Sequence, residues 1–246
     1  MRIAFISDIH GNHTALQAVL ADIKKQGADQ VVCLGDVVSL GPQPREVIEA
    51  LHEVNSINIK GNHDAAILEP ERSAQYEITP HLIPDLHWGR ERLTADDFDF
   101  IRSFKPMHEI KFPNGIKLLA FHGSPLATTD IILATTPTET LDHYFHGHSA
   151  DVFIGGHSHI QMHRRYGKRL VVNSGSVGNA FEFAYSPGNP PHLLPWAEYA
   201  VLSQSGNDLQ VDLHRVYFDI PALLAEVRAS GLPGTEWWLR QYQSSG

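Results

Sequence analysis

Apolar stretches alternate with amphipathic stretches in the first quarter of the chain. Residues 2–7 are mostly apolar, which is typical of a buried strand, and the apolar residues of 15–23 then recur at helical spacing. A second apolar run at 31–34 is followed by a helical apolar face over 44–54 and by a third run at 57–59. This repeated order of strand, helix and strand predicts a largely parallel sheet.

The second half of the chain changes to strands joined by shorter connections. Strands are predicted at 116–121 and 151–155, with a helix between them that carries Leu141, Tyr144 and Phe145. Four strands with an antiparallel arrangement are expected to follow at 160–165, 169–173, 197–203 and 209–218. The apolar residues of the last strand suggest one buried face formed by Val211, Leu213 and, after a shift in the alternation, Val216 and Phe218.

Three further segments complete the expected organisation. The stretch from about 70 to 106 has a helical and partly polar pattern, and we predict that it is an inserted cap. The stretch 185–195 carries four prolines and is predicted to be a loop. A final helix over 220–230 is expected to end at Gly231, because Pro233 follows shortly after.

The composition is the one expected of a single large domain in the cytoplasm. A chain of 246 residues that is 42% hydrophobic can bury one substantial core, so residues 1–246 are expected to form a single domain. The single cysteine, Cys33, rules out an internal disulfide and fits a reducing cytoplasm. We expect neither export nor membrane insertion, because there is no signal-like start and no apolar stretch of roughly 20 residues.

Charge and histidine content narrow the class of function. The net charge is -9, from 28 acidic and 19 basic residues, which is the wrong sign for non-specific binding of nucleic acid. A nucleotide substrate would have to be held locally. Histidine is abundant, with 16 residues, and histidine together with aspartate is the composition of a metal site.

Five short polar motifs each come directly after a predicted strand. They are Asp8-Ile9-His10-Gly11-Asn12, Gly35-Asp36, Gly61-Asn62-His63-Asp64, His122-Gly123 and Gly156-His157-Ser158-His159. Each motif alone is weak, because H-x-H pairs arise by chance and a carboxylate or asparagine after a strand is common at helix starts and turns. The carboxyl ends of strands in an open α/β sheet converge on one crevice, however, so we expect the five motifs to meet.

The order D-x-H, G-D, G-N-H-D, H-G and G-H-S-H resembles the calcineurin-like metallophosphoesterase superfamily, in particular its small bacterial and archaeal phosphodiesterases. The likeness extends to Gly41-Pro42, to Asn173-x-Gly175-Ser176-Val177-Gly178 and to Ala229-Ser-Gly-Leu-Pro233, and so covers nearly the whole chain. It implies an α/β (α+β) fold, an αββα four-layer sandwich of two mixed β-sheets flanked by helices.

The resemblance also implies two divalent metal ions per chain. One ion would be bound by Asp8, His10, Asp36 and His159, and the other by Asp36, Asn62, His122 and His157. Asp36 would bridge the two, because a shared anion offsets the repulsion between neighbouring cations. Imidazole combined with carboxylate suits Mn, Fe, Ni, Co or Zn better than Ca or Mg.

The reaction that the resemblance implies is attack on phosphorus by a metal-bridging hydroxide. His63 resembles the family's general acid, which protonates the leaving oxygen, and Asp64 is expected to orient the His63 imidazole. The alternative interpretations are a structural histidine and an ordinary acidic turn residue. The expected substrate is a small phosphate ester or nucleotide, and we predict that diesters are preferred over monoesters.

Two positions depart from the protein serine/threonine phosphatases of this superfamily, which carry G-D-x-x-D-R-G. Ser39 and Leu40 stand here before Gly41, so the aspartate that supports the catalytic histidine and the arginine that grips phosphate are both missing. Arg45 could replace that arginine, or it could be a solvated residue at a helix start.

The competing functions fall into two classes. The enzymatic alternatives are a phosphomonoesterase or protein phosphatase, a diadenosine polyphosphate hydrolase and a nuclease, the last disfavoured by the acidic charge. The alternative of another class is a non-catalytic scaffold with the same fold, as in a retromer subunit that has lost its catalytic histidine chemistry.

Overall fold

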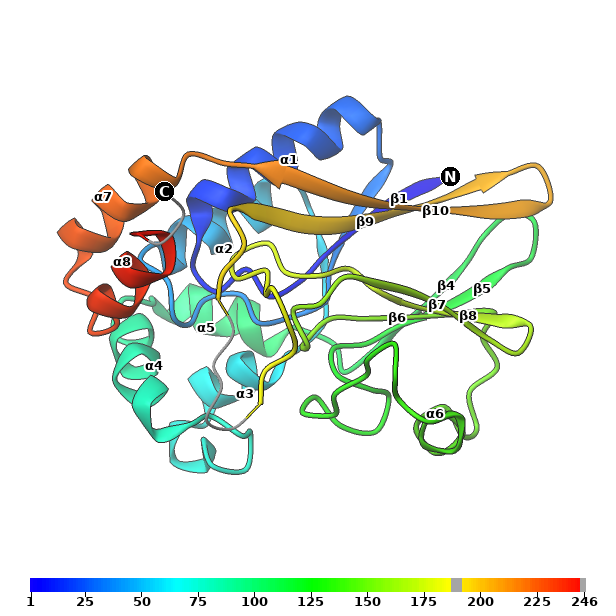
Figure 1. The fold of residues 1–246 in the computed structure, drawn as a ribbon, viewed down its shortest axis with the longest axis horizontal. Coiled ribbons are helices and arrows are strands. Elements are labelled where there is room, and N and C mark those ends of the chain that lie inside the picture. The colour runs from blue at the N-terminus through cyan, green and yellow to red at the C-terminus, as the bar shows by residue number, and fades with distance from the viewer. Residues whose placement is uncertain (187–191, 244–246) are drawn as a thin grey trace.

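Two five-stranded sheets pack face to face with helices on their outer sides (Figure 1). The computed structural model describes residues 1–186 and 192–243, so residues 187–191 of the predicted loop lie outside the described residues. The strand order is β10-β9-β1-β2-β3 in the first sheet and β4-β5-β6-β8-β7 in the second. This arrangement confirms the predicted αββα sandwich.

Both sheets are mixed, as predicted. The first contains β1 (Arg2–Ile6), β2 (Gln30–Cys33), β3 (Ile57–Asn58), β9 (Trp196–Ser205) and β10 (Asp208–Tyr217). The second contains β4 (His108–Lys111), β5 (Lys117–Ala120), β6 (Val152–Gly155), β7 (Met162–Tyr166) and β8 (Arg169–Asn173). Strands β1, β2 and β3 are parallel, and so are β5, β6 and β8, whereas β4, β7, β9 and β10 run antiparallel to their neighbours.

Capping side chains and glycines mark the ends of several helices. They are α1 (His13–Gln26), α2 (Pro44–Glu53), α3 (Asn62–Leu68), α4 (Ile83–Arg90), α5 (Ala95–Arg102), α6 (Thr138–Tyr144), α7 (Ile220–Ser230) and α8 (Thr235–Gln243), with 3₁₀ turns η1 (Pro70–Arg72) and η2 (Pro80–Leu82). The Asn12 side chain caps α1 by accepting from the Ala15 amide at 3.0 Å. Gly27 ends that helix in the left-handed conformation, at φ 65°. None of the helices in the described ranges is long and apolar enough to cross a bilayer.

Successive side chains of β1 point to opposite faces of its sheet, so the strand contributes to two hydrophobic cores. Ile3 and Phe5 point into the core between the sheets, while Ala4 and Ile6 face the core under α1 and α2. A third core joins the second sheet to α6 (Figure 1), and a fourth, around Trp238, joins α8 to α7 and α4. The carboxyl ends of the parallel strands of both sheets are thereby held at one end of the molecule.

One prediction about the core is wrong. Leu213 was expected on the buried face of its strand, but it is 38% exposed. Strand β10 is an edge strand, and its alternation shifts where Val211 and Asp212 are both half-buried. Val216 and Phe218 pack against the core on the α1 side instead, because the shift turns the second half of the strand over.

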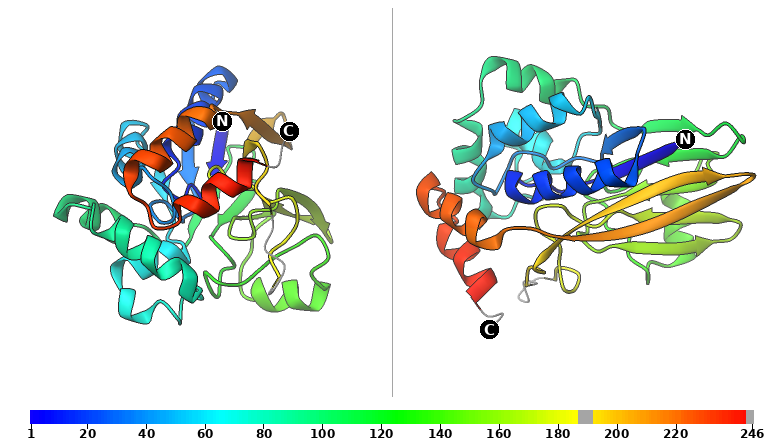
Figure 2. Two further views of the ribbon diagram at one scale, coloured as in Figure 1. Left: turned by 60° about the vertical axis from the view of Figure 1, so that its left-hand side comes forward. Right: turned by 90° about the horizontal axis from the view of Figure 1, so that it is seen from above.

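The predicted cap contains η1, η2, α4 and α5. Figure 2 shows these elements, in cyan and green, gathered beside α3. The C-terminal helix α8 contacts α7, and the amide of Gly234 at its start donates to Asp85 Oδ1 of α4 at 2.7 Å. The segments at about 80–85 and 233–243 are thus fixed to each other although they are far apart in the sequence.

Candidate metal centre

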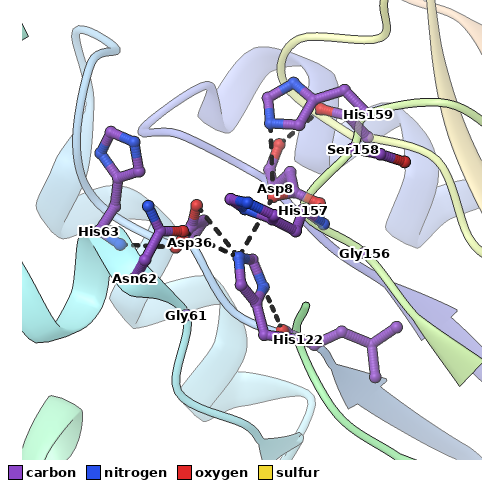
Figure 3. A network of polar contacts seen from close by, with 12 residues as sticks. Asp8, Asp36, Gly61, Asn62, His63, His122, Gly156, His157, Ser158 and His159 are labelled. Carbon is purple, nitrogen blue, oxygen red and sulfur yellow. Dashed lines mark hydrogen bonds and ion pairs between the residues drawn. The ribbon is translucent and has the colours of Figure 1, made fainter. Parts of the chain in front are cut away.

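The seven predicted ligands meet at the strand ends where the two sheets come together. Asp8 and His10 follow β1, Asp36 follows β2, Asn62 follows β3, His122 follows β5, and His157 and His159 follow β6. Candidate ligand atoms lie within 4.8 Å of one another in three groups, which are Asp8 with His10 and His159, His10 with Asp36 and His63, and Asp36 with His122 and His157. Figure 3 shows the imidazoles of His122 and His159 turned toward the carboxylates of Asp36 and Asp8. Asn62 joins them, because its Oδ1 lies 3.1 Å from His122 Nε2.

The backbone at these residues is strained in the way functional sites often are. Five of the seven have positive φ angles, namely Asp8 (53°), His10 (49°), Asp36 (59°), His157 (64°) and His159 (58°). Non-glycine residues rarely adopt this conformation, and each instance costs about 1–3 kcal/mol. Hydrogen bonds between the loops hold it, such as the 2.9 Å bond from the Asp8 amide to the Gly35 carbonyl.

Gly35 allows the loops of the two sheets to close on each other. Its φ is 110°, and a Cβ at this position would lie 2.5 Å from the Gly61 amide nitrogen and 2.9 Å from His122 Nδ1. Any side chain at this position would push Gly61, in the loop after β3, and His122 away from Asp36. The glycine before Asp36 is therefore required by close packing.

Each of the two carboxylates accepts a backbone hydrogen bond through one oxygen, and its other oxygen faces the imidazoles. Asp8 Oδ2 accepts from the His157 amide and Asp36 Oδ1 from the His63 amide, both at 2.9 Å. Asp8 Oδ1 is buried, accepts no well-formed hydrogen bond and lies 3.4 Å from His159 Nε2. Asp36 Oδ2 lies 3.4 Å from His122 Nε2. A buried anionic oxygen without a donor is unfavourable unless a cation meets it.

Hydrogen bonds to backbone carbonyls orient three of the imidazoles. Three of them donate a ring N–H to a backbone carbonyl, His122 Nδ1 to Leu34 at 2.8 Å, His159 Nδ1 to Asn179 at 2.7 Å and His157 Nε2 to Thr129 at 3.2 Å. A carbonyl oxygen can only accept, so when such a ring is in the neutral form that binds a metal, its opposite nitrogen carries a lone pair that faces the carboxylates. Metal-binding histidines are commonly fixed in this way.

The electrostatics of the cluster favour a bound cation. Burial lowers the pKa of His10 to about 3 and that of His157 to about 4, so both rings are neutral. Burial alone would raise the pKa of Asp8, but His159 and His122 lower it to about 2. Burial opposes a charge on His122 as well, yet the carboxylates of Asp36 and Asp8 raise its pKa to about 9. The two buried carboxylates thus demand positive charge, and the donor set fits a divalent metal ion.

Asp64 makes different contacts from the one predicted. Its carboxylate accepts from three backbone amides, those of Asp36 at 2.8 Å, Val37 at 2.9 Å and Gly61 at 2.9 Å. Burial, followed by the charge of Asp36, raises the pKa of Asp64 to about 6. His63 and Asp64 are consecutive on α3, and consecutive helical side chains do not face each other. The three amides belong to the loops that carry Asp36 and Asn62, so these contacts link the two loops and give the predicted orienting role of Asp64 no support.

Ser39 contacts the His63 ring where Asp64 was expected to. Its hydroxyl lies 2.8 Å from His63 Nδ1 and 3.5 Å from His10 Nδ1, and the side chain is completely buried. The sequence did carry a signal for this role, since Ser39 occupies the position of the second aspartate in G-D-x-x-D-R-G. The sequence pattern shows that the carboxylate is lost but not that the hydroxyl takes its place beside His63.

A cavity of about 500 Å³ opens from the cluster toward α8. Its inner part is lined by predicted ligands and by His63, and its outer part by Thr79, Leu82, Asp85, Phe181, Tyr185, Trp237 and Arg240, among others. Arg45 is not part of this lining, and its Nε pairs with Asp97 Oδ2 at 3.2 Å. The prediction missed α8 and therefore missed Arg240.

Comparison with known proteins agrees with this geometry. The Calcineurin-like phosphoesterase superfamily domain matches residues 1–187. The uncharacterized protein MJ0912 of Methanocaldococcus jannaschii is 30% identical over 240 residues, which make up 96% of this chain and 94% of that protein. The phosphodiesterase YfcE of Escherichia coli is 38% identical over 77 residues, 27% of this chain and 42% of YfcE.

Two solved structures have the same fold over almost their entire length. A metallophosphoesterase from Sphaerobacter thermophilus superposes with a TM-score of 0.75 at 24% identity over 98% of each chain. The hypothetical protein PH1004 from Pyrococcus horikoshii OT3 gives a TM-score of 0.80 at 23% identity, over 97% of this chain and 96% of that one. With the family match covering most of the sequence, the chain belongs to the calcineurin-like phosphoesterase superfamily.

Proposed function

We propose that this chain is a dinuclear-metal-dependent phosphodiesterase. The observation that carries the proposal is the buried cluster of carboxylate oxygens and imidazole nitrogens, in which Asp8 Oδ1 has no hydrogen-bond donor. Membership of a phosphoesterase superfamily and the phosphodiesterase activity named for YfcE support it. The proposed ligands are Asp8, His10, Asp36, Asn62, His122, His157 and His159.

Two divalent ions in this cluster would supply a water of lowered pKa and positive charge against the phosphate oxygens. The protein's own groups would do the rest. Asp36 and His10 each belong to two of the three ligand groups, whereas Asp8 belongs to one. A carboxylate has two oxygens with which to reach two ions and an anionic charge to offset their repulsion, so Asp36 is the residue that both ions would share. The fixed carboxylates and imidazoles would hold the phosphate between the ions and His63, which lines the same cavity.

Ser39 would select the proton position on His63. With His10 Nε2 in the ligand cluster, its Nδ1 carries the ring proton and directs it at the Ser39 oxygen. The Ser39 hydroxyl proton then goes to His63 Nδ1, which leaves the His63 proton on Nε2. The Nε2–H of this neutral ring would thus donate a hydrogen bond to the leaving oxygen of a bound ester and stabilise the negative charge that develops there.

Exchange of the shared carboxylate is expected to remove more metal than exchange of the unshared one. Asp36→Asn weakens both proposed sites, whereas Asp8→Asn weakens one, so metal per chain should fall further in Asp36→Asn. Elemental analysis of the purified variants measures this, with Asp29→Asn, whose side chain is 64% exposed, as the control. Equal retention of both metals in the two variants would contradict the bridging role of Asp36.

The preference for diesters follows from the charge of the site. Two divalent ions would bring four positive charges, of which Asp8 and Asp36 offset two and an anionic nucleophile a third. A diester carries one negative charge and neutralises the remainder, whereas a monoester near pH 7 carries closer to two. Within the described part of the chain, Arg240 is the only arginine or lysine lining the cavity, and Glu77, Asp85 and Glu236 oppose it.

With the same metal, kcat/KM for bis(4-nitrophenyl) phosphate is therefore expected to exceed that for 4-nitrophenyl phosphate by about tenfold or more, a difference of about 1.4 kcal/mol. A clear monoester preference would reverse this assignment. If neither ester is hydrolysed by protein that has bound its metal, the non-catalytic scaffold becomes the better interpretation.

A further inference from the structure

The outer half of the cavity is formed by a helix outside the matched family domain. That domain ends at residue 187, whereas α8 spans Thr235–Gln243. The helix is fixed at two points, since Trp238 Nε1 donates to the Leu40 carbonyl at 2.9 Å and the Gly234 amide donates to Asp85 Oδ1 at 2.7 Å. Leu40 lies in the loop that begins with Asp36. The helix is thus attached directly to the metal-site loop and to α4.

Aromatic side chains line the cavity from the metal cluster to α8. Trp237 of α8 is half-buried, and Tyr185 is 45% exposed. Phe181 stacks on the proposed ligand His159, with ring centroids 4.3 Å apart and planes 26° apart. Together the three rings give the cavity apolar walls that begin beside the metal cluster and reach α8. Such walls suit a flat ring better than a flexible polar chain.

Carboxylates also line this cavity. Glu77, Asp85 and Glu236 line it together with Arg240. This excess of negative charge disfavours a substrate with further phosphates and favours one whose ring edge carries N–H donors. A nucleobase with an amino group has both properties, a π face for the aromatic walls and N–H groups for the carboxylates. A cavity of about 500 Å³ has the size of a pocket for a ligand of nucleotide size.

We propose that the aromatic and acidic outer half of this cavity binds the amino-bearing nucleobase of a nucleoside phosphodiester. The inference rests on the proposed phosphodiesterase function and adds the substrate class to it. Trp237 is the residue that stacks on the base, and the acidic groups select against diadenosine polyphosphates.

Two diesters with the same leaving group test this. Adenosine 5′-(4-nitrophenyl phosphate) and methyl 4-nitrophenyl phosphate differ only in the group that would enter the outer half of the cavity. The ratio of their kcat/KM values is expected to be about 10 or more in favour of the adenosine ester, as one base–aromatic stack provides. Trp237→Leu should bring the ratio toward one, while Trp237→Phe should keep most of it because the ring is retained.

The control is Tyr217→Ala, an aromatic residue that is 74% exposed and does not line the cavity, and its ratio should equal that of the parent protein. Tyr185→Ser repeats the test at an exposed position if Trp237→Leu fails to fold. Hydrolysis of both esters with a ratio near one that neither substitution changes overturns the nucleobase inference alone. Hydrolysis of neither ester by metal-loaded protein overturns the proposed function.

Discussion

Strong chelation is expected to abolish hydrolysis of an aryl phosphodiester, and added Mn²⁺ is expected to restore it. The proposed site places two buried carboxylates and several neutral imidazoles around one volume, and no other group in the cavity is expected to activate water. Rates measured before chelation, after removal of the chelator and after addition of Mn²⁺ give the result. An undiminished rate in protein shown to be metal-free would disprove the two-metal proposal.

A second measurement separates metal binding from catalysis. A ligand present at 100 times its Kd stabilises the folded state by about 2.7 kcal/mol. For a domain of this size that corresponds to a rise in Tm of roughly 5–10 °C. The parent protein should show this rise with Mn²⁺, and Asp36→Asn should show much less of it. An equal rise in both would place the metal outside the proposed cluster.

The fold was largely predictable because most of its elements follow local periodicity. The strand at the start of the chain and the helices α1 and α2 have clear apolar patterns bounded by Asn12, Gly27 and Pro44. Helix α8 was not predicted, and it is held in place by hydrogen bonds to the distant Asp85 and Leu40, which the local sequence pattern does not show. Leu213 was misplaced because the shift in β10 depends on which neighbours cover an edge strand.

In the candidate site, too, the features that depend on local sequence were predictable, and those that depend on contacts between distant residues were not. The seven proposed ligands were predictable because each lies in a motif directly after a strand, and the topology brings strand ends together. The direction of a side chain was not predictable in this way. Asp64 and His63 are neighbours in sequence but face different partners, whereas Ser39 reaches His63 from another loop. The outer wall of the cavity was equally hidden, because it comes from α8 and residues 181–185.

His63→Ala is expected to keep both metals and to lower kcat by a factor on the order of 100 to 10,000. The ring is not one of the proposed ligands, and the Ser39 hydroxyl at 2.8 Å from its Nδ1 would leave Nε2 to face a leaving group. The penalty should be small for 4-nitrophenolate, which leaves without much protonation, and large for alkyl leaving groups. His146→Ala, an exposed histidine after α6, is the control. An equal penalty for leaving groups of widely different pKa would assign His63 to binding or structure.

Ser39 provides the strictest test of how His63 acts. Removing its hydroxyl in Ser39→Ala should cost about tenfold in kcat, the value of roughly one hydrogen bond, because His63 loses the group that fixes its ring and its proton. The loss should again be larger for poor leaving groups. In a His63→Ala background the same substitution should have almost no further effect, since the two residues act as a unit. If Ser39→Ala and His63→Ala instead reduce kcat independently, the hydroxyl supports His10 and the metal cluster rather than His63.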